Sequence, residues 1–325
     1  MRTYNYLIIC LVLLSFFKGS VNADEIQLAI VKSYFTTIKP EKNLNPAKVK
    51  LGLILYKDKR FSKNNDVSCF SCHDLGAGGV DHLKSSTGTQ KRIGDFNSPT
   101  VYNSHLNFVQ TWNGRAASLE DQLDGPVGSE VEFGSSWNDI VEKLQKDKAI
   151  MKLYTKIYNS KMTSDNLKNA LVEFERSLST PDSKFDEYLR GKIELSLEEK
   201  SGLKLFINNG CVSCHQGEGI GGNLFQKLGV IIPYFDKSKK YKKFHYGKFN
   251  ISKKERDKFV FKVPSLRNIT LTAPYFHDGS IATLDRAIEL MGFHQLGIKF
   301  SKKEVQEIKA FLKTLTGKVD GELIK

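Results

Sequence analysis

The 325-residue sequence lacks the features that mark membrane-spanning, disordered and β-sheet proteins. Beyond residue 23 no segment is apolar enough to cross a bilayer, and the alternating pattern of β-strands is scarce. Hydrophobic residues make up 40% and charged residues 26% of the chain, which excludes intrinsic disorder. Methionine occurs four times and histidine seven times, so few side chains are available to bind a metal.

The first 23 residues resemble a secretory signal peptide. Arg2 precedes an apolar run over residues 7–17, and small residues then lead to the sequence VNA at 21–23. We expect cleavage after Ala23 and export to the periplasm, with a retained membrane anchor as the alternative. Cys10 lies in this segment and would leave with it, so the mature chain would keep four cysteines.

Those four cysteines occur as two copies of the pattern CxxCH. Residues 69–73 read CFSCH and residues 211–215 read CVSCH. Two thiols at this spacing can form thioethers with one haem, and the adjacent histidine can then bind the iron. Disulfide bonds and a four-cysteine zinc site remain alternatives, but neither needs the histidines. We predict two covalently bound haem c groups, held by Cys69, Cys72 and His73 and by Cys211, Cys214 and His215.

The sequence around the first motif is repeated around the second. A glycine followed four residues later by an aromatic residue precedes each motif, as Gly52 with Tyr56 and Gly202 with Phe206. Each half also contains an amphipathic stretch with helical spacing, over residues 167–178 and 305–315. We predict a mainly α fold of two cytochrome c-like haem domains in tandem, an N-terminal domain over 24–190 and a C-terminal domain over 191–325.

The net charge is +13, and the densest basic stretch runs from Lys237 to Lys258. Aromatic residues within this stretch would suit nucleic acid, but the predicted export argues against that ligand. A solvated loop or a docking face for an acidic redox partner is the preferred interpretation.

The sixth ligand decides what a haem iron does. A second strong protein ligand favours electron transfer, whereas an open position favours chemistry at the iron. Met291 stands near the end of a predicted helix and could bind the iron of the second haem, although core packing is the alternative for a lone methionine.

Several segments together resemble the bacterial di-haem cytochrome c peroxidases. They are residues 78–81 (GGVD), 97–103 (NSPTVYN), 112–116 (WNGRA), 125–127 (GPV), 263–268 (VPSLRN) and 272–279 (TAPYFHDG). The resemblance runs from about residue 46 to residue 317. It implies that the first haem reacts with peroxide and that the second, with Met291 as its sixth ligand, receives electrons.

The resemblance also implies catalytic roles. Glu132 matches the distal acid–base glutamate, Gln122 matches a distal glutamine, and Trp112 matches the tryptophan that lies between the haems. Heterolytic cleavage of peroxide requires a proton to leave one oxygen and to reach the other, which a single carboxylate can accomplish.

Further residues are implied to bind cofactors. Asn97, with the carbonyls of Thr272 and Pro274, resembles a calcium site that joins the domains, and such oxygens suit this ion. Arg115 and Arg267 are candidate partners of haem propionates, although either could form an ordinary ion pair. We expect His277 to hydrogen-bond a propionate or a water near the second haem.

One departure from the resemblance concerns the first haem. Related enzymes often carry a histidine in the loop after the first motif, which blocks the resting iron, whereas this sequence has Thr89 there. We interpret His82 as a surface or loop residue. The first haem is therefore predicted to be open in the fully oxidised protein.

The predicted function is a periplasmic peroxidase that reduces hydrogen peroxide to water with electrons from a small cytochrome c or a copper protein. The resemblance also allows a homodimer. One alternative is the related di-haem branch that oxidises tryptophans on a partner protein, which has tyrosine in place of the methionine ligand. The other is a di-haem electron carrier without catalysis, which requires two protein ligands at both irons.

Overall fold

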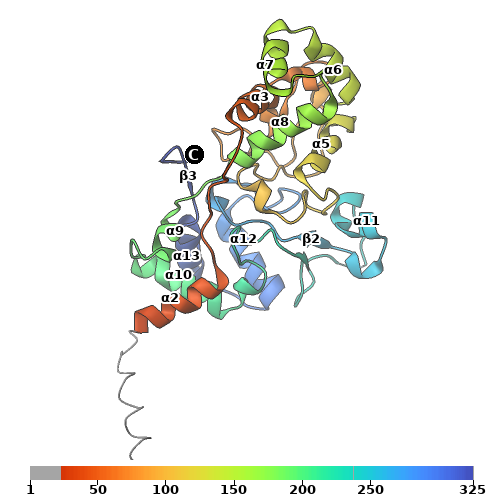
Figure 1. The fold of residues 1–325 in the computed structure, drawn as a ribbon. Helices are drawn as coiled ribbons and strands as arrows, with labels where there is room; N and C mark the ends of the chain where they lie inside the picture. The colour runs from red at the N-terminus through yellow and green to blue at the C-terminus, as the bar shows by residue number, and fades with distance from the viewer. Residues whose placement is uncertain (1–22, 237, 325) are drawn as a thin grey trace, which may run out of the picture.

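A computed structural model describes residues 23–236 and 238–324, and helices dominate this part of the chain (Figure 1). The predicted signal peptide, apart from Ala23, and Lys237 of the basic stretch lie outside the described residues. The described strands are short and pair into two antiparallel sheets of two strands each, so the predicted mainly α class is confirmed. No helix among the described residues has the length and apolar character needed to cross a membrane.

The elements have the following bounds. The α-helices are α2 (Ala23–Tyr34), α3 (Pro46–Tyr56), α4 (Cys69–Cys72), α5 (Leu119–Gly128), α6 (Trp137–Gln145), α7 (Lys148–Tyr158), α8 (Ser164–Ser177), α9 (Lys184–Leu189), α10 (Leu197–Asn208), α11 (Phe249–Ser252), α12 (Leu284–Met291) and α13 (Lys302–Lys313). The 3-10 helices are η1 (Lys59–Phe61), η2 (Thr89–Lys91), η3 (Ser104–Leu106), η4 (Cys211–Ser213), η5 (Lys243–Tyr246), η6 (Glu255–Asp257) and η7 (Ile269–Leu271), and η8 (Gly292–Leu296) is a π-helical turn. The strands are β1 (Phe225–Lys227), β2 (Val260–Lys262), β3 (Lys318–Val319) and β4 (Glu322–Leu323).

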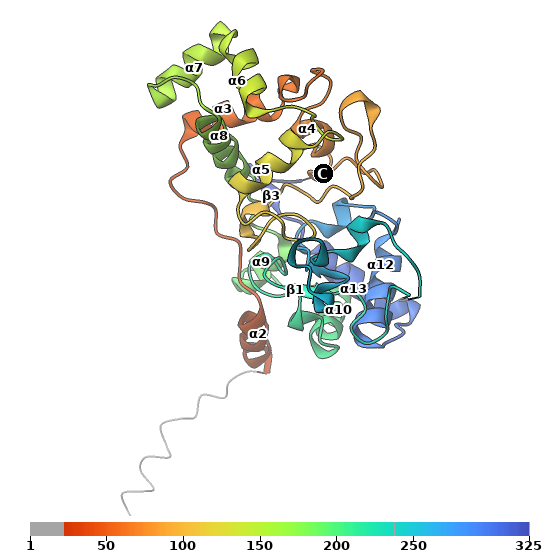
Figure 2. The ribbon, with the colours of Figure 1, turned by 90° about the vertical axis from the view of Figure 1, so that its right-hand side faces the viewer.

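Two lobes, each with its own apolar core, make up the molecule (Figures 1 and 2). In the first lobe α3 packs on α8, and in the second lobe α10 packs on α13. A Cβ atom on Gly52 of α3 would collide with the carbonyl of Ala170, and one on Gly202 of α10 would collide with the carbonyl of Glu307. The repeated glycine therefore lets the helix before each CxxCH motif cross a long helix at close range.

Capping residues fix the N-terminal ends of α3 and α10. The side chain of Asn45 accepts hydrogen bonds from the amides of Ala47 and Lys48 at the start of α3, whose first residue is Pro46. In the second lobe Ser196 and Glu199 form a reciprocal capping box at the start of α10. Each cap satisfies amide groups that have no partner within the helix.

The packing does not follow the predicted division between residues 190 and 191 at every place. Val31 and Phe35, at the N-terminal end of the described chain, pack in the core of the second lobe, and so does Phe185 of α9. At the opposite end, Ile324 packs in the core of the first lobe. The N-terminal end of the described chain therefore packs in the second lobe, and its C-terminal end packs in the first. The predicted domain bounds stay a prediction.

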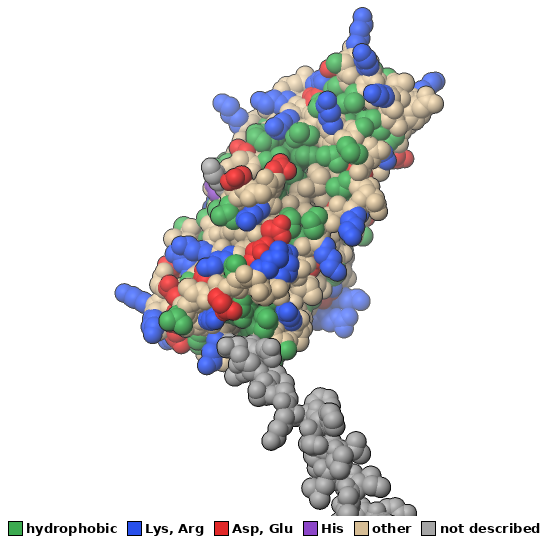
Figure 3. All heavy atoms as spheres, turned by 60° about the vertical axis from the view of Figure 1, so that its left-hand side comes forward, with side chains coloured by type: hydrophobic (Ala, Val, Ile, Leu, Met, Phe, Trp, Pro, Cys, Tyr) green, Lys and Arg blue, Asp and Glu red, His purple; other side chains and the backbone are tan. Residues whose placement is uncertain are grey.

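A small antiparallel sheet of β1 and β2 lies next to a separate aromatic cluster. The ring centroids of Phe235 and Phe259 stack 4.4 Å apart in this cluster. On the face shown in Figure 3, lysine and arginine side chains are scattered over both lobes. The β1–β2 sheet matters most for the site, because β2 leads directly into the segment 263–268.

Candidate haem sites and distal pocket

The first motif forms a single turn of helix, α4. Cys69 and Cys72 lie three residues apart on this turn, which places both thiols on one face. The amide of His73 donates to the carbonyl of Cys69 at 3.0 Å, so the histidine follows directly on the turn. The phenol of Tyr56, four residues after Gly52, donates a 2.7 Å hydrogen bond to the carbonyl of His73. The aromatic residue of the repeat thus fixes the backbone of the motif.

The second motif has the same arrangement on η4. The amide of His215 donates to the carbonyl of Cys211 at 2.9 Å, and the ring of Phe206 lies 6.3 Å from the His215 ring. The Nδ1 atom of His215 is buried near the carbonyls of Ile220 and Pro264 but makes no hydrogen bond of standard geometry within the described chain. In the first lobe, His73 Nδ1 lies 3.3 Å from the carbonyl of Gly79.

The residues of both motifs fit haem c. All four cysteines are free rather than paired in disulfides. Burial lowers the pKa of His73 and lowers the pKa of His215 to about 4, so both imidazoles are neutral and keep a lone pair for iron. Burial also raises the pKa of Cys72 to about 11, so this thiol is neutral near pH 7.

A cavity of about 330 Å³ lies against the second motif. Its lining is mainly apolar and includes the second motif, Cys211, Cys214 and His215, together with Met291 at the end of α12. The structure therefore brings the predicted pair of axial ligands to one cavity. The other two described methionines, Met151 and Met162, belong to the core of the first lobe.

The same cavity reaches the boundary between the lobes. Its lining also includes Trp112, Asn97 and His277. Thr272 and Pro274, whose carbonyls belong to the predicted calcium site, line the same cavity. The indole of Trp112 donates a 2.8 Å hydrogen bond to the carbonyl of Asn97, and the amide of Asn97 donates to the carbonyl of His277 at 2.9 Å. The amide nitrogen of the Asn97 side chain donates to the carbonyl of Leu83, so it is this side chain's oxygen that is left for a cation.

His277 has a partner that the sequence did not reveal. Its Nε2 lies 2.9 Å from Nδ1 of His245, and both pKa values are lowered chiefly by burial. The ring of Phe261 lies 4.3 Å from the ring of His277. Because the partner is 32 residues away, with short helices and strand β2 between the two, no spacing rule could have paired the two histidines.

The predicted distal residues gather around α5 and the turn that follows it. Gln122 lies on α5 one turn before Gly125, and the guanidinium of Arg115 lies against Gly125. The turn after α5 brings back Glu132, whose amide donates to the carbonyl of Ser129 at 3.1 Å. Burial raises the pKa of the Glu132 carboxyl, and the charge of Arg115 opposes that rise.

Glu132 also acts electrostatically on the first motif. Its negative charge adds to the effect of burial in raising the pKa of Cys72. Arg115, one of the two candidate propionate partners, thus has its guanidinium beside Glu132 and α5. Its contact with a propionate stays a prediction.

The loop with Thr89 is closely tied to the distal turn. Thr89 is buried, and its hydroxyl donates to Asp66 at 2.9 Å and accepts from the Asn64 amide at 3.0 Å. His82 is exposed, as expected for a loop residue, and its Nδ1 lies 2.8 Å from the carbonyl of Ala273.

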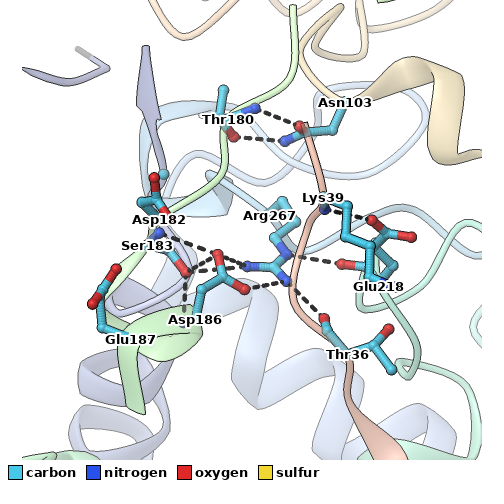
Figure 4. Close-up of polar contacts among 12 residues, drawn as sticks. Thr36, Lys39, Asn103, Thr180, Asp182, Ser183, Asp186, Glu187, Glu218 and Arg267 are labelled. Atoms are coloured by element: carbon cyan, nitrogen blue, oxygen red, sulfur yellow. Dashed lines mark hydrogen bonds and ion pairs between the residues drawn. The ribbon is translucent and has the colours of Figure 1, made fainter. Parts of the chain in front are cut away.

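The sequence predicted that Arg267 binds a haem propionate, but in the structure this side chain is bound to other protein groups. Its side chain is 1% exposed and forms a buried ion pair with Asp186 at 2.9 Å (Figure 4). Its Nε and both terminal nitrogens donate to five acceptors, namely Glu218 O, Ser183 Oγ, Thr36 O and both carboxylate oxygens of Asp186. A guanidinium has five N–H groups, so none is left for a propionate. Of the two roles left open by the sequence, the structure shows the ion pair.

Comparisons with known proteins agree with this arrangement. The family model described as di-haem cytochrome c peroxidase matches residues 46–194, and the model described as cytochrome c matches residues 199–316. These matches, with the helical lobes, confirm two cytochrome c-like domains in tandem.

Relatives of the chain are similar over most of its length. The cytochrome c551 peroxidase of Nitrosomonas europaea is 43% identical over 86% of this chain and 84% of its own. The cytochrome c peroxidase Ccp of Escherichia coli is 43% identical over 83% of this chain, and the match spans 58% of that longer relative. Among solved structures, a MauG-like protein associated with microbial copper homeostasis has a TM-score of 0.76 at 27% identity, covering 86% of this chain and 92% of that one.

Proposed function

Since the chain belongs to the family of di-haem cytochrome c peroxidases, we propose that it reduces hydrogen peroxide to water in the periplasm, with electrons from a small cytochrome c or a copper protein. Family membership makes the chain an oxidoreductase that acts on peroxide, with haem c as its cofactor. When bound at the two motifs, haem c supplies the one-electron chemistry and the iron with which peroxide reacts.

Glu132 is the observation that carries the proposal for the first site. Its carboxyl is partly buried, its pKa is raised by burial and lowered by the charge of Arg115, and its own charge acts on Cys72 of the first motif. In reducing peroxide the O–O bond breaks, two electrons and two protons are taken up, and two molecules of water form. Glu132 accepts the proton of one peroxide oxygen and returns it to the other, which a carboxyl with a raised pKa does more readily near neutral pH.

Arg115 and Gln122 act on that carboxyl and on the substrate. The guanidinium lowers the pKa of Glu132 against the effect of burial, which favours the ionised form that accepts a proton. Gln122, on the same helix face as Gly125, offers an amide that can donate to or accept from a peroxide oxygen. Together the two side chains hold the substrate and the proton acceptor in one orientation.

Met291 supports the assignment of the second site to electron entry. Met291 and His215 line one cavity, and a histidine–methionine pair raises the reduction potential of a haem. Met291 also argues against the tryptophan-oxidising branch, which has tyrosine there. Two sites of unequal ligation suit the reaction, because single electrons must be stored until both are present. We infer that electrons pass from the second site to the first by way of Trp112, which lines the cavity of the second site.

The calcium site remains part of the proposal. Asn97, Thr272 and Pro274 line the cavity at the lobe boundary, and their oxygens suit a hard cation. Treatment of the holoenzyme with a calcium chelator should lower its turnover, and added Ca²⁺ should restore it. Unchanged turnover with no calcium found by elemental analysis would remove calcium from the proposal.

Turnover of variants tests the proposed function. With a reduced small cytochrome c as donor, the wild-type holoenzyme should oxidise the donor on addition of peroxide. Glu132→Gln should lower the rate by about 10²- to 10⁴-fold while the absorption spectra of both haems stay unchanged. Glu130→Gln is the matched control, because its carboxylate is 79% exposed in the same turn and should leave the rate unchanged. Equal rates for the two variants would contradict the role of Glu132.

A further inference from the structure

One lysine is buried in the lining of the cavity that lies against the second motif. Lys262, the last residue of β2, is 7% exposed and lines the cavity together with His215 and Met291. Its ammonium donates a hydrogen bond to the side-chain oxygen of Asn107 at 3.3 Å. Within residues 23–236 and 238–324, no carboxylate forms an ion pair with it.

Such an ammonium needs an anion. Removing a charged group from water costs several kcal/mol unless a partner of opposite charge compensates it. Burial lowers the pKa of Lys262 to about 8, so the side chain is still mainly protonated at neutral pH. One neutral amide oxygen satisfies one of its three N–H groups, and the charge itself stays uncompensated.

The anion is expected inside the cavity rather than in the protein around it. Only one other arginine or lysine lines this cavity in the described part of the chain, and that residue is Arg267, whose five N–H groups are all taken. Lys262 therefore supplies the free cationic N–H groups of the lining. Haem c brings two carboxylates, its propionates, into the site that binds it.

We propose that Lys262 is the counter-ion of a propionate of the second haem and thereby raises the reduction potential of that haem. The proposal rests on haem c at the second motif, as proposed above. Reduction adds one electron to the haem, and a nearby fixed cation in a medium of low polarity stabilises the reduced form.

The backbone holds the lysine in place from the other lobe. The amide of Lys262 donates a 2.9 Å hydrogen bond to the carbonyl of Trp112, and Asn107, the partner of its ammonium, also belongs to the first half of the chain. The cation is thus positioned where the lobes meet, on the side of the cavity that faces Trp112. Lys262 is a positioning and tuning residue and does not contact the peroxide.

A spectroelectrochemical titration of the holoenzyme tests the proposal. In Lys262→Gln the ratio of reduced to oxidised second haem at a fixed solution potential should fall about tenfold, which is a 59 mV lower midpoint for a one-electron couple. Lys262→Arg, which keeps the charge, should restore the wild-type midpoint. The matched control is Lys227→Gln, which removes a charge from the neighbouring strand β1 at a residue outside the cavity lining. The first haem serves as the internal reference.

A second variant tests the proposal without removing the lysine side chain from the cavity lining. Asn107→Asp keeps Lys262 and places a carboxylate beside its ammonium, so it should also lower the midpoint of the second haem. Wild-type midpoints in both Lys262→Gln and Asn107→Asp, with both haems retained, would overturn the proposal. The titration needs no peroxide, so a failure of the proposed peroxidase activity would be seen separately in turnover.

Discussion

The amide of Thr89 donates a 2.7 Å hydrogen bond to the carbonyl of Glu132. Next to it, a Cβ atom on Gly88 would collide with the carbonyl of Val131, so the loop and the distal turn lie in direct backbone contact. Residue 89 is thereby fixed next to the backbone of Glu132, the proposed acid–base residue, with its hydroxyl bonded to Asp66. The loop position that often carries a blocking histidine in related enzymes is occupied here by a short side chain that already has its partners.

We expect the first haem of the fully oxidised protein to react with peroxide without prior reduction. Thr89 cannot bind iron, and its side chain is held by Asp66 and Asn64. The electron paramagnetic resonance spectrum of the resting holoenzyme should contain a high-spin signal, and stopped-flow mixing with peroxide should change the haem absorption at once. A resting spectrum with two low-spin irons only would refute this expectation.

The acid limb of the pH–rate profile should depend on Arg115. Burial raises the pKa of Glu132 and Arg115 lowers it, and Glu132 must be ionised to accept a proton. Turnover is therefore lost as the pH falls through this pKa, and removal of the guanidinium in Arg115→Gln should move the loss to higher pH. Arg115→Lys keeps the charge and should stay close to the wild-type profile. An unshifted acid limb in Arg115→Gln would show that the charge of Arg115 does not affect the pKa of Glu132.

The buried ion pair between Arg267 and Asp186 should dominate the local stability. Asp186→Asn keeps the size of the side chain but leaves the guanidinium uncompensated, which should lower the free energy of unfolding by about 3 kcal/mol or more. Chemical denaturation followed by circular dichroism measures the change. The exposed pair of Arg286 and Glu289 provides the control, since Arg286→Gln should cost less than about 1 kcal/mol. Equal losses in the two variants would contradict the weight given to the buried pair.

The close crossing of α3 and α8 predicts that Gly52→Ala is destabilising. The added methyl group collides with the carbonyl of Ala170, which should lower the free energy of unfolding by about 1–3 kcal/mol. Gly128→Ala is the matched control within a helix, because nothing lies within 4 Å of its added Cβ atom. Thermal or chemical unfolding of the two variants decides the point, and equal stability would place the helices further apart than described.

Local patterns of the sequence could predict the features that depend on neighbouring residues. The CxxCH motifs, the helix before each of them and the amphipathic helices follow from short spacings. Met291 was a candidate ligand from the sequence alone, the resemblance favoured it over core packing, and it shares a cavity with His215. Arg267 could not be assigned in this way. Its partner Asp186 is 81 residues away, and the choice between a propionate and a carboxylate depends on burial.

Two further features depended on tertiary structure. The sequence suggested nothing special about Lys262, because a lysine beside Phe261 and Val263 resembles any residue of an exposed strand until the cavity behind it is known. The pairing of His245 with His277 depends on how the segment between them, with its short helices and strand β2, folds on the second lobe. In both cases the decisive contact lies between segments whose relative placement no short pattern encodes.

The placement of the chain ends has a consequence for how the molecule assembles. Val31 and Phe35 complete the second core, although they precede both motifs, and Ile324 completes the first core, although it follows both. The second core is therefore complete only when α2 has docked against it, and the first core only when the segment that carries Ile324 has docked. Each lobe thus depends for part of its core on a segment from the far end of the described chain.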